Sequence, residues 1–217
     1  MGDLFDLAGK AAIVTGSTRG IGRAIAGALI DAGARVVISS EDAADTARVA
    51  TELGMPGIAC DVSDDAALAR LVDFSAAELG RIDVLVCNAG ITGQAGPFAT
   101  IDMDDYARVM AINLTINAYA LAKAGVAQLA RNLAVEWGPQ AVRVNALSPG
   151  FIATELSQPL LDNPDFMARR MGMTPLRRPG TPDEVAGAAV FLASPAGGFV
   201  TGHNLVVDGG TLITDGS

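Results

Sequence analysis

Residues 11–22, with the sequence AAIVTGSTRGIG, decide the fold. The apolar run at 11–14 predicts a short buried strand, and apolar residues at helical spacing from Ile21 onward predict a helix. The glycines between them allow a tight turn and a close approach to a bound group. The helix N-terminus offers unpaired N–H groups that suit a pyrophosphate. The alternative is that the glycines only form the turn.

Outside this stretch, short apolar strands alternate with helices. Strands are predicted at 35–38, 57–60, 82–87, 142–145 and 205–208. Helices are predicted at 43–53, from the cap Ser63 to Gly80, at 103–114 and at 119–137. This alternation predicts an α/β fold with a parallel sheet covered by helices on both faces. We therefore expect one Rossmann-like, doubly wound domain over residues 1–217.

The alternation fails at one place. Only Thr115-Ile116-Asn117-Ala118 separates the helices predicted at 103–114 and 119–137, and no strand fits there. A doubly wound sheet needs a strand between successive crossover helices. Typical element lengths imply that roughly 25–40 residues are absent at the junction of Thr115 and Ile116. A segment omitted from the sequence, a deletion in the gene and an engineered chain all remain open. A natural loss is disfavoured, because it would leave backbone groups of neighbouring strands unpaired.

Composition excludes several classes of function. The 217 residues are 50% hydrophobic and 18% charged, which excludes a disordered chain. A net charge of −9 disfavours nucleic acids and anionic membranes as partners. One histidine and two cysteines show no metal-ligand spacing, so no metal site is predicted. We expect Cys60 and Cys87 to be buried free thiols, and the absence of a secretory signal favours the cytoplasm.

An acidic residue is expected about 20 positions after such a glycine turn, where it binds ribose hydroxyls. Glu41 follows Gly22 by 19 residues, and a carboxylate there repels a 2′-phosphate. Arg19 acts in the opposite direction, because it can pair with that phosphate. The cofactor is therefore NAD or NADP, with the balance slightly toward NAD. Alternatively, Glu41 and Asp42 only cap the next helix.

Several motifs occur in register along the chain. They are Thr-Gly-x-x-x-Gly-x-Gly at 15–22, Asp61-Val62, Asn88-Ala89-Gly90, Tyr119-Ala120-Leu121-Ala122-Lys123, Ser148-Pro149-Gly150 and Val207-Asp208-Gly209-Gly210. In order and context the chain resembles the classical short-chain dehydrogenases/reductases over nearly its whole length. That resemblance implies an oxidoreductase that moves a hydride between NAD(P) and an alcohol or carbonyl substrate.

The resemblance assigns cofactor contacts to residues distributed along the chain. The glycine turn would hold the dinucleotide, and Asp61 and Val62 would hold the adenine. Residues 88–90 would line the adenosine side and brace the sheet. The residues after the strand at 142–145 would position the nicotinamide carboxamide. The full set is Gly16, Ser17, Thr18, Arg19, Gly20, Ile21, Gly22, Glu41, Asp61, Val62, Asn88, Ala89, Gly90, Tyr119, Lys123, Pro149, Gly150, Ile152 and Thr154.

The predicted catalytic residues are Asn113, Tyr119 and Lys123. A tyrosine and a lysine four residues apart project from one face of a helix. The ammonium lowers the phenol pKa from its usual value near 10, so that the tyrosine can exchange a proton with the substrate. The resemblance implies that Lys123 also binds the nicotinamide ribose and that Asn113 organises a proton-relay water.

The family also uses a serine past the strand that should precede the tyrosine helix. Here Thr115 has the only hydroxyl between Asn113 and Tyr119. Our hypothesis is that the complete protein has this serine in the absent segment. If the two helices were continuous, Asn113 would lie roughly 240° around the axis from Tyr119. The alternative is a catalytically impaired or non-catalytic dinucleotide-binding protein; a methyltransferase is disfavoured by Asn88-Ala89-Gly90 and the tyrosine–lysine pair.

Residues 155–176 correspond to the substrate lid of the family. Their apolar side chains and methionines favour a hydrophobic or mixed alcohol/ketone substrate, and a helical pair that only packs on the core is the alternative. The family resemblance also implies a homodimer or homotetramer.

Overall fold

The computed structural model describes residues 4–91, 102, 104 and 119–214, and the side chains of 119–124 lie outside the description. Its first part contains strands β1 (Ala11–Thr15), β2 (Arg35–Ser39) and β3 (Val84–Val86). They form a parallel sheet in the order β2-β1-β3, with Ala11 opposite Arg35 and Ala12 opposite Val84. The predicted parallel α/β architecture is confirmed.

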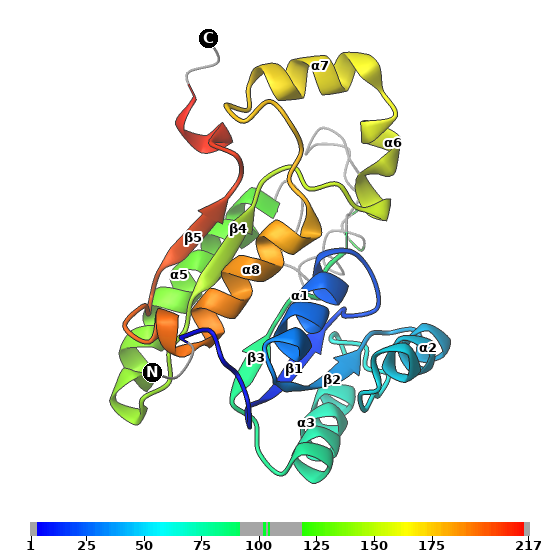
Figure 1. The fold of residues 1–217 in the computed structure, drawn as a ribbon, viewed down its shortest axis with the longest axis vertical. Coiled ribbons are helices and arrows are strands. Elements are labelled where there is room, and N and C mark those ends of the chain that lie inside the picture. The colour runs from blue at the N-terminus through cyan, green and yellow to red at the C-terminus, as the bar shows by residue number, and fades with distance from the viewer. Residues whose placement is uncertain (1–3, 92–101, 103, 105–118, 215–217) are drawn as a thin grey trace.

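Helices cover both faces of this sheet, because its side chains alternate. Val14 and Ile38 point into a cluster with Leu29 of α1 (Gly20–Asp31) and Val190 of α8 (Pro182–Ala193). Ile13 points to the other face, toward α3 (Asp65–Leu79). All five residues of β1 are buried. Helix α2 (Ala43–Leu53) packs beyond β2, and Figure 1 shows α1 and α8 beside each other.

The second part holds the long helix α5 (Tyr119–Trp137) and strands β4 (Ala146–Pro149) and β5 (Asn204–Val207). β4 and β5 pair in parallel, with Ala146 opposite Asn204. From the carboxyl end of β4 the chain enters α6 (Gln158–Leu161) and α7 (Pro164–Gly172), which extend beyond the sheets (Figure 1). Short 3₁₀ turns lie at Gly138–Gln140, Glu155–Ser157, Pro195–Gly197 and Thr211–Ile213.

Within the described ranges the strands form two separate sheets, and no strand pairs β3 with β4. The missing strand expected from the sequence would lie there. On β3 itself, the side chain of Leu85 is 61% exposed. Cys60 is buried as predicted, but the prediction for Cys87 was wrong, because this residue lies just past the open strand and is exposed.

Three local predictions need correction. Residues 57–60 form no strand; only Gly57 makes a bridge to Ile38, although the amides of Ile58 and Cys60 still donate to β2 and the loop after it. Residues 142–145 precede the strand, because pairing with β5 begins at Ala146. The cap of α3 is Asp64, whose carboxylate accepts the Ala66 amide. Of the helix predicted at 103–114, only residue 104 lies within the described part of the structure.

No helix among the described residues is long and apolar enough to cross a membrane. In the same residues no group of three or more His, Cys, Asp or Glu side chains is arranged to hold a metal ion.

Candidate cofactor and substrate site

The glycine turn connects β1 to α1 and has the backbone geometry that its residues predict. Gly16 and Gly20 have φ of 64° and 54°, a region that favours glycine. A Cβ atom at Gly16 would lie 2.9 Å from the Cα of Ala89, and one at Gly22 would overlap the carbonyl oxygen of Gly16. Only glycine fits at either position, because backbone rather than a flexible side chain is in the way.

The N-terminus of α1 is suited to an anion. Arg19 is the N-cap residue, and its side chain makes no capping hydrogen bond. The first turn contains no acidic residue, so neither a capping side chain nor a negative charge competes with a bound phosphate. The turn and helix therefore fit the pyrophosphate of a dinucleotide.

Asn88 holds the turn against β3. Its Nδ2 donates to the carbonyl oxygens of Thr15 at 3.0 Å and Gly16 at 3.1 Å. The backbone amides of Asn88 and Ala89 both donate to Thr15 Oγ1 at 3.1 Å, and this hydroxyl lies 3.3 Å from the Val86 carbonyl oxygen, to which it donates. Asn88 thus braces the turn against the end of β3. Thr15 shares that role, although the sequence analysis left it out of the site.

A second brace ties the turn to β2. The Ser17 amide and hydroxyl both donate to the Ser39 carbonyl oxygen, at 2.9 and 3.3 Å, and the Ser39 amide donates back to Ser17 Oγ at 2.8 Å. Both serines are fully buried, and Ser39 Oγ has no partner among the described residues. Sequence reasoning missed Ser39, because a serine at a strand end carries no motif.

The two residues predicted to select the cofactor contact each other. Arg19 Nη2 and Glu41 Oε1 lie 3.5 Å apart, and both side chains are more than half exposed. Asp42 rather than Glu41 caps α2, since its Oδ1 accepts the Asp45 amide at 2.8 Å. Glu41 is therefore not used as a helix cap and remains at the edge of the dinucleotide site.

Asp61 and Val62 follow the segment that runs beside β2. The Asp61 carboxylate accepts the amide and hydroxyl of Ser63 at 2.9 and 2.7 Å, which fixes its orientation. Val62 packs against the second core cluster. Burial, and then the charge of Asp61, raise the pKa of the neighbouring Cys60 thiol, so it stays protonated and is no nucleophile.

The residues predicted for the nicotinamide side lie after β4. The Gly150 amide donates to the Val207 carbonyl oxygen at 2.9 Å, and a Cβ there would lie 2.6 Å from the Cα of Asp208. Ile152 is buried and pairs with Gly180. Pro149 is the last residue of β4.

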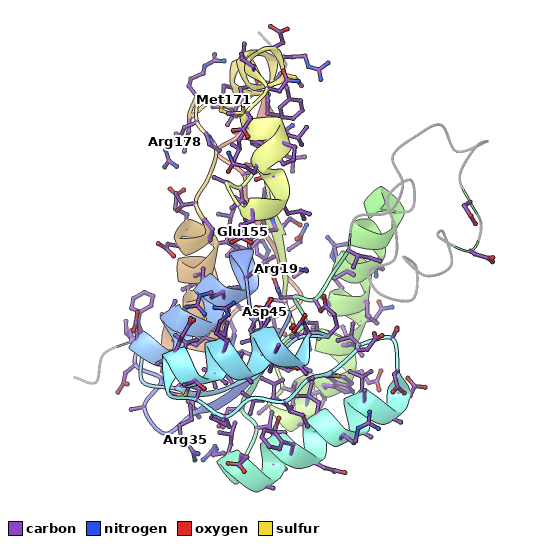
Figure 2. All side chains as sticks on the ribbon, turned by 90° about the vertical axis from the view of Figure 1, so that its right-hand side faces the viewer. Arg19, Arg35, Asp45, Glu155, Met171 and Arg178 are labelled. Atoms are coloured by element: carbon purple, nitrogen blue, oxygen red, sulfur yellow. The ribbon has the colours of Figure 1, made fainter. Side chains whose placement is uncertain are left out.

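The fold brings Thr154 to the glycine turn. A Cβ at Gly20 would lie 3.6 Å from Thr154 Cγ2, although more than a hundred residues separate them in sequence. Figure 2 shows Arg19 and Glu155 beside each other, in agreement with this contact. The pyrophosphate end and the nicotinamide end of the predicted site are thus parts of one surface.

The predicted catalytic residues are placed less completely. Tyr119 and Lys123 belong to the first turns of α5, which confirms the predicted helix. Their side chains lie outside the described part of the structure, and so does Asn113. The described residues therefore support a dinucleotide site at the carboxyl ends of parallel strands, where ligands of this sheet type bind.

Comparison with protein families matches the chain in two pieces. The model described as short chain dehydrogenase matches residues 10–116, and the model described as Enoyl-(Acyl carrier protein) reductase matches residues 115–211. The two matched pieces meet at Thr115 and Ile116, the junction at which a strand is expected and no residues for it are present.

A curated relative shows the same difference in length. D-threitol dehydrogenase from Mycolicibacterium smegmatis is 37% identical over 249 aligned positions, which cover 96% of this chain and 95% of the relative. Because the alignment covers 96% of the 217 residues, which is about 208, about 41 of the 249 positions oppose a gap in this chain. That number lies close to the upper end of the length expected for the absent segment.

Solved structures of similar proteins carry both forms of the cofactor. Gluconate 5-dehydrogenase from Burkholderia cenocepacia, in complex with NADP and tartrate, has a TM-score of 0.92 at 31% identity, over 98% of each chain. A 7α-hydroxysteroid dehydrogenase, complexed with NADH and 7-oxo glycochenodeoxycholic acid, has a TM-score of 0.89 at 34% identity, over 97% of each chain. The glycine turn, the sheet and these full-length relatives together place the chain in the short-chain dehydrogenase/reductase family, as an NAD(P)-dependent dehydrogenase acting on CH–OH groups.

Proposed function

We propose that the protein interconverts a secondary alcohol and its ketone, with Tyr119 as general acid/base. The observation that carries the proposal is the convergence of the glycine turn, Asn88 and Thr154 on one surface at the carboxyl ends of the strands. Bound nicotinamide dinucleotide supplies the hydride acceptor or donor. The protein's own groups then have to bind the substrate and move its hydroxyl proton.

Tyr119 takes the proton from the alcohol, or returns it to the ketone, at its phenol oxygen. Lys123, one turn further along α5, lowers the phenol pKa and binds the nicotinamide ribose. Asn113 organises the water that carries the proton onward. Residues 155–176 close over the substrate as a lid, and α6 and α7 lie within this segment.

The test is turnover. Consumption of NADH or NADPH, followed by absorbance, is measured with a panel of ketones that includes polyol, sugar-acid and steroid substrates. Tyr119→Phe keeps the ring and removes the hydroxyl, so kcat falls by about 10²–10⁴-fold. A Tyr119→Phe variant that turns over at the wild-type rate contradicts the assignment.

We propose a preference for NAD, supported by the contact between Arg19 and Glu41. Glu41 occupies the guanidinium that would otherwise hold a 2′-phosphate, and it repels that phosphate directly. In Glu41→Gln the ratio of the two dissociation constants, measured by fluorescence titration with NADH and NADPH, shifts toward NADPH by about tenfold. Asp45→Asn is the matched control, because Asp45 pairs with Arg48 on α2 and not with Arg19. If the ratio of the NADH and NADPH dissociation constants is the same in Glu41→Gln and Asp45→Asn, the proposed preference for NAD is contradicted.

One observation favours a second candidate, a dinucleotide-binding protein with impaired catalysis. The family matches divide at 115–116, and no described residue completes the sheet between β3 and β4. In this reading the serine that polarises the substrate oxygen is lost with the strand. An intact mass of the natural protein decides between omission and loss: a mass of 22.1 kDa shows that the serine segment is absent from the protein itself.

We further propose a homodimer or homotetramer, supported by the family resemblance and by exposed apolar residues Val126 and Leu129 on α5. Light scattering after size exclusion tests this, and a monomer at micromolar concentration contradicts it.

A further inference from the structure

A cavity of about 360 Å³ lies between the segment after β4 and helix α7. Its walls are Phe151, Phe166, Arg169, Arg170 and Met173. The rings of Phe151 and Phe166 are 5.5 Å apart between centres and tilted by 60°. Phe151 directly follows Gly150 at the carboxyl end of β4, so the cavity adjoins the predicted nicotinamide side of the site. In Figure 2, Met171 marks this helix at the end of the molecule away from Arg35.

Two arginines, Arg169 and Arg170, line this cavity, and their effect on the stability of α7 does not explain the position of both. Arg169 and Arg170 both lie in the last turn of α7, where cations favour the helix dipole. Arg169 is exposed, as that role predicts. Arg170 instead turns inward: its Cζ lies 6.0 Å from the centre of the Phe151 ring, a cation–π arrangement that holds the guanidinium against the apolar wall.

Arg170 also has an unused donor. Its Nε atom is buried and has no hydrogen-bond partner among the described residues. Within the same residues no carboxylate forms an ion pair with either arginine. A buried N–H without an acceptor is destabilising, and it adds to the positive character of a guanidinium whose two Nη groups have no partner among the described residues and can bind a carboxylate through both oxygens.

We propose that this cavity is a carboxylate subsite, in which Arg170 binds the acid group of the substrate and the two phenylalanine rings bind its apolar body. The inference rests on the proposed function and narrows it: the substrate is a hydroxy acid or keto acid with an alkyl or cyclic skeleton. The chain's own charge of −9 adds to this argument, because an acidic protein needs a local cationic group to hold an anionic substrate.

The test uses binding alone, so it does not depend on turnover. Benzoate and benzamide have the same ring and nearly the same shape, and they differ in charge. Their dissociation constants are measured by calorimetry with the NADH-loaded protein. Benzoate binds at least tenfold more tightly than benzamide, and its affinity falls between 20 mM and 500 mM NaCl while that of benzamide does not.

Two variants assign the difference to Arg170. Arg170→Gln abolishes the preference for benzoate, and Arg170→Lys keeps part of it, because the charge remains and the fork is lost. Arg70→Gln, the same change on the exposed face of α3, leaves it intact. An unchanged NADH dissociation constant shows that each variant is folded.

Equal affinity for the two probes overturns the inference, and so does binding of neither. The inference is also overturned if Arg170→Gln and Arg70→Gln change the preference for benzoate over benzamide to the same extent. Benzoate selectivity in a protein that reduces no ketone contradicts the proposed function and not the subsite. Ketone turnover without benzoate selectivity contradicts the subsite alone.

Discussion

Residues 4–91 and residues 119–214 both contain parallel strands flanked by helices, but they bury their sheets to different degrees. The first region holds three paired strands, with a core cluster on each face. The second holds two, and the cluster formed by α5 and β4 consists of three alanines, Ala127, Ala130 and Ala146. Its main attachment to the first region is α8, whose Ala186, Ala189 and Val190 pack into the cluster around α1.

The two regions differ in how far their sheets are completed by the described residues. The glycine turn and its braces lie within the first region and are held by buried and partly buried hydrogen bonds. The edges of β3 and β4 that would meet in a continuous sheet carry no partner in the described ranges. We therefore expect dinucleotide binding to depend mainly on the first region, and catalysis to depend on the residues that would complete the sheet between the two regions.

The largest effect is expected from filling that gap. The residues of D-threitol dehydrogenase that oppose it are inserted between Thr115 and Ile116. We expect this segment to contain the family's serine, which would polarise the substrate oxygen, so ketone turnover rises by at least about 10²-fold. A glycine–serine insert of equal length is the control. If both inserts give the same turnover, the gap is not what limits catalysis.

The next effect tests the completeness of the first region. In Gly22→Ala a methyl group meets the Gly16 carbonyl oxygen and Asn88, so the turn is displaced and the NADH dissociation constant rises by about 100-fold or more. Gly27→Ala is the matched control in the same helix, because its Cβ meets nothing within 4 Å, and it stabilises α1 by about 0.5–1 kcal/mol. Titration of NADH fluorescence measures both. Equal affinities in the two variants would refute a sterically defined turn.

A pair of hydroxyl deletions compares the two sheets directly. Thr15→Val leaves the Ala89 amide without an acceptor, while the Asn88 amide keeps the Val86 carbonyl oxygen, and lowers the free energy of unfolding by about 2 kcal/mol. Ser148→Ala removes one partly buried bond, to Asn204 Oδ1, and costs about 1 kcal/mol. Urea denaturation measures both. If Ser148→Ala lowers the free energy of unfolding more than Thr15→Val does, the second region depends more on its hydrogen bonds than the first, contrary to this expectation.

The smallest effect concerns the segment that leads into α8. The Arg178 guanidinium, and then the Thr181 amide, lower the pKa of Glu184 to about 2, from 4.5. Because the folded-state pKa is the lower one, this contribution to stability is present above pH 4.5 and is lost as the pH falls toward 2. Thermal unfolding at pH 6, 4 and 2.5 should show a higher Tm for the wild type than for Glu184→Gln at pH 6, and a difference in Tm that shrinks at each lower pH. A difference that is constant across this range argues against the link.

The residues alone were enough to predict the parallel α/β architecture, the glycine turn and the junction at which no strand fits. These follow from local rules: apolar periodicity, glycine at strained backbone positions and the need for a strand between crossover helices. Helix 43–53 and helix 119–137 could be assigned for the same reason, since their periodic patterns are long. The segments 57–60 and 142–145 could not, because a strand exists only where a neighbour pairs with it.

Which side chains lie together in one site depends on how the elements pack in the folded protein. Thr154 reaches Gly20, Arg19 meets Glu41, and Arg170 lies over Phe151 through contacts between segments far apart in sequence or on different elements. No periodic pattern encodes such contacts, because they depend on how helices pack on the sheet and on where each strand ends. The burial of single residues depends on the same packing. Ser39 is buried because the glycine turn crosses the end of its strand, whereas Cys87 is exposed beside an edge that no described strand covers.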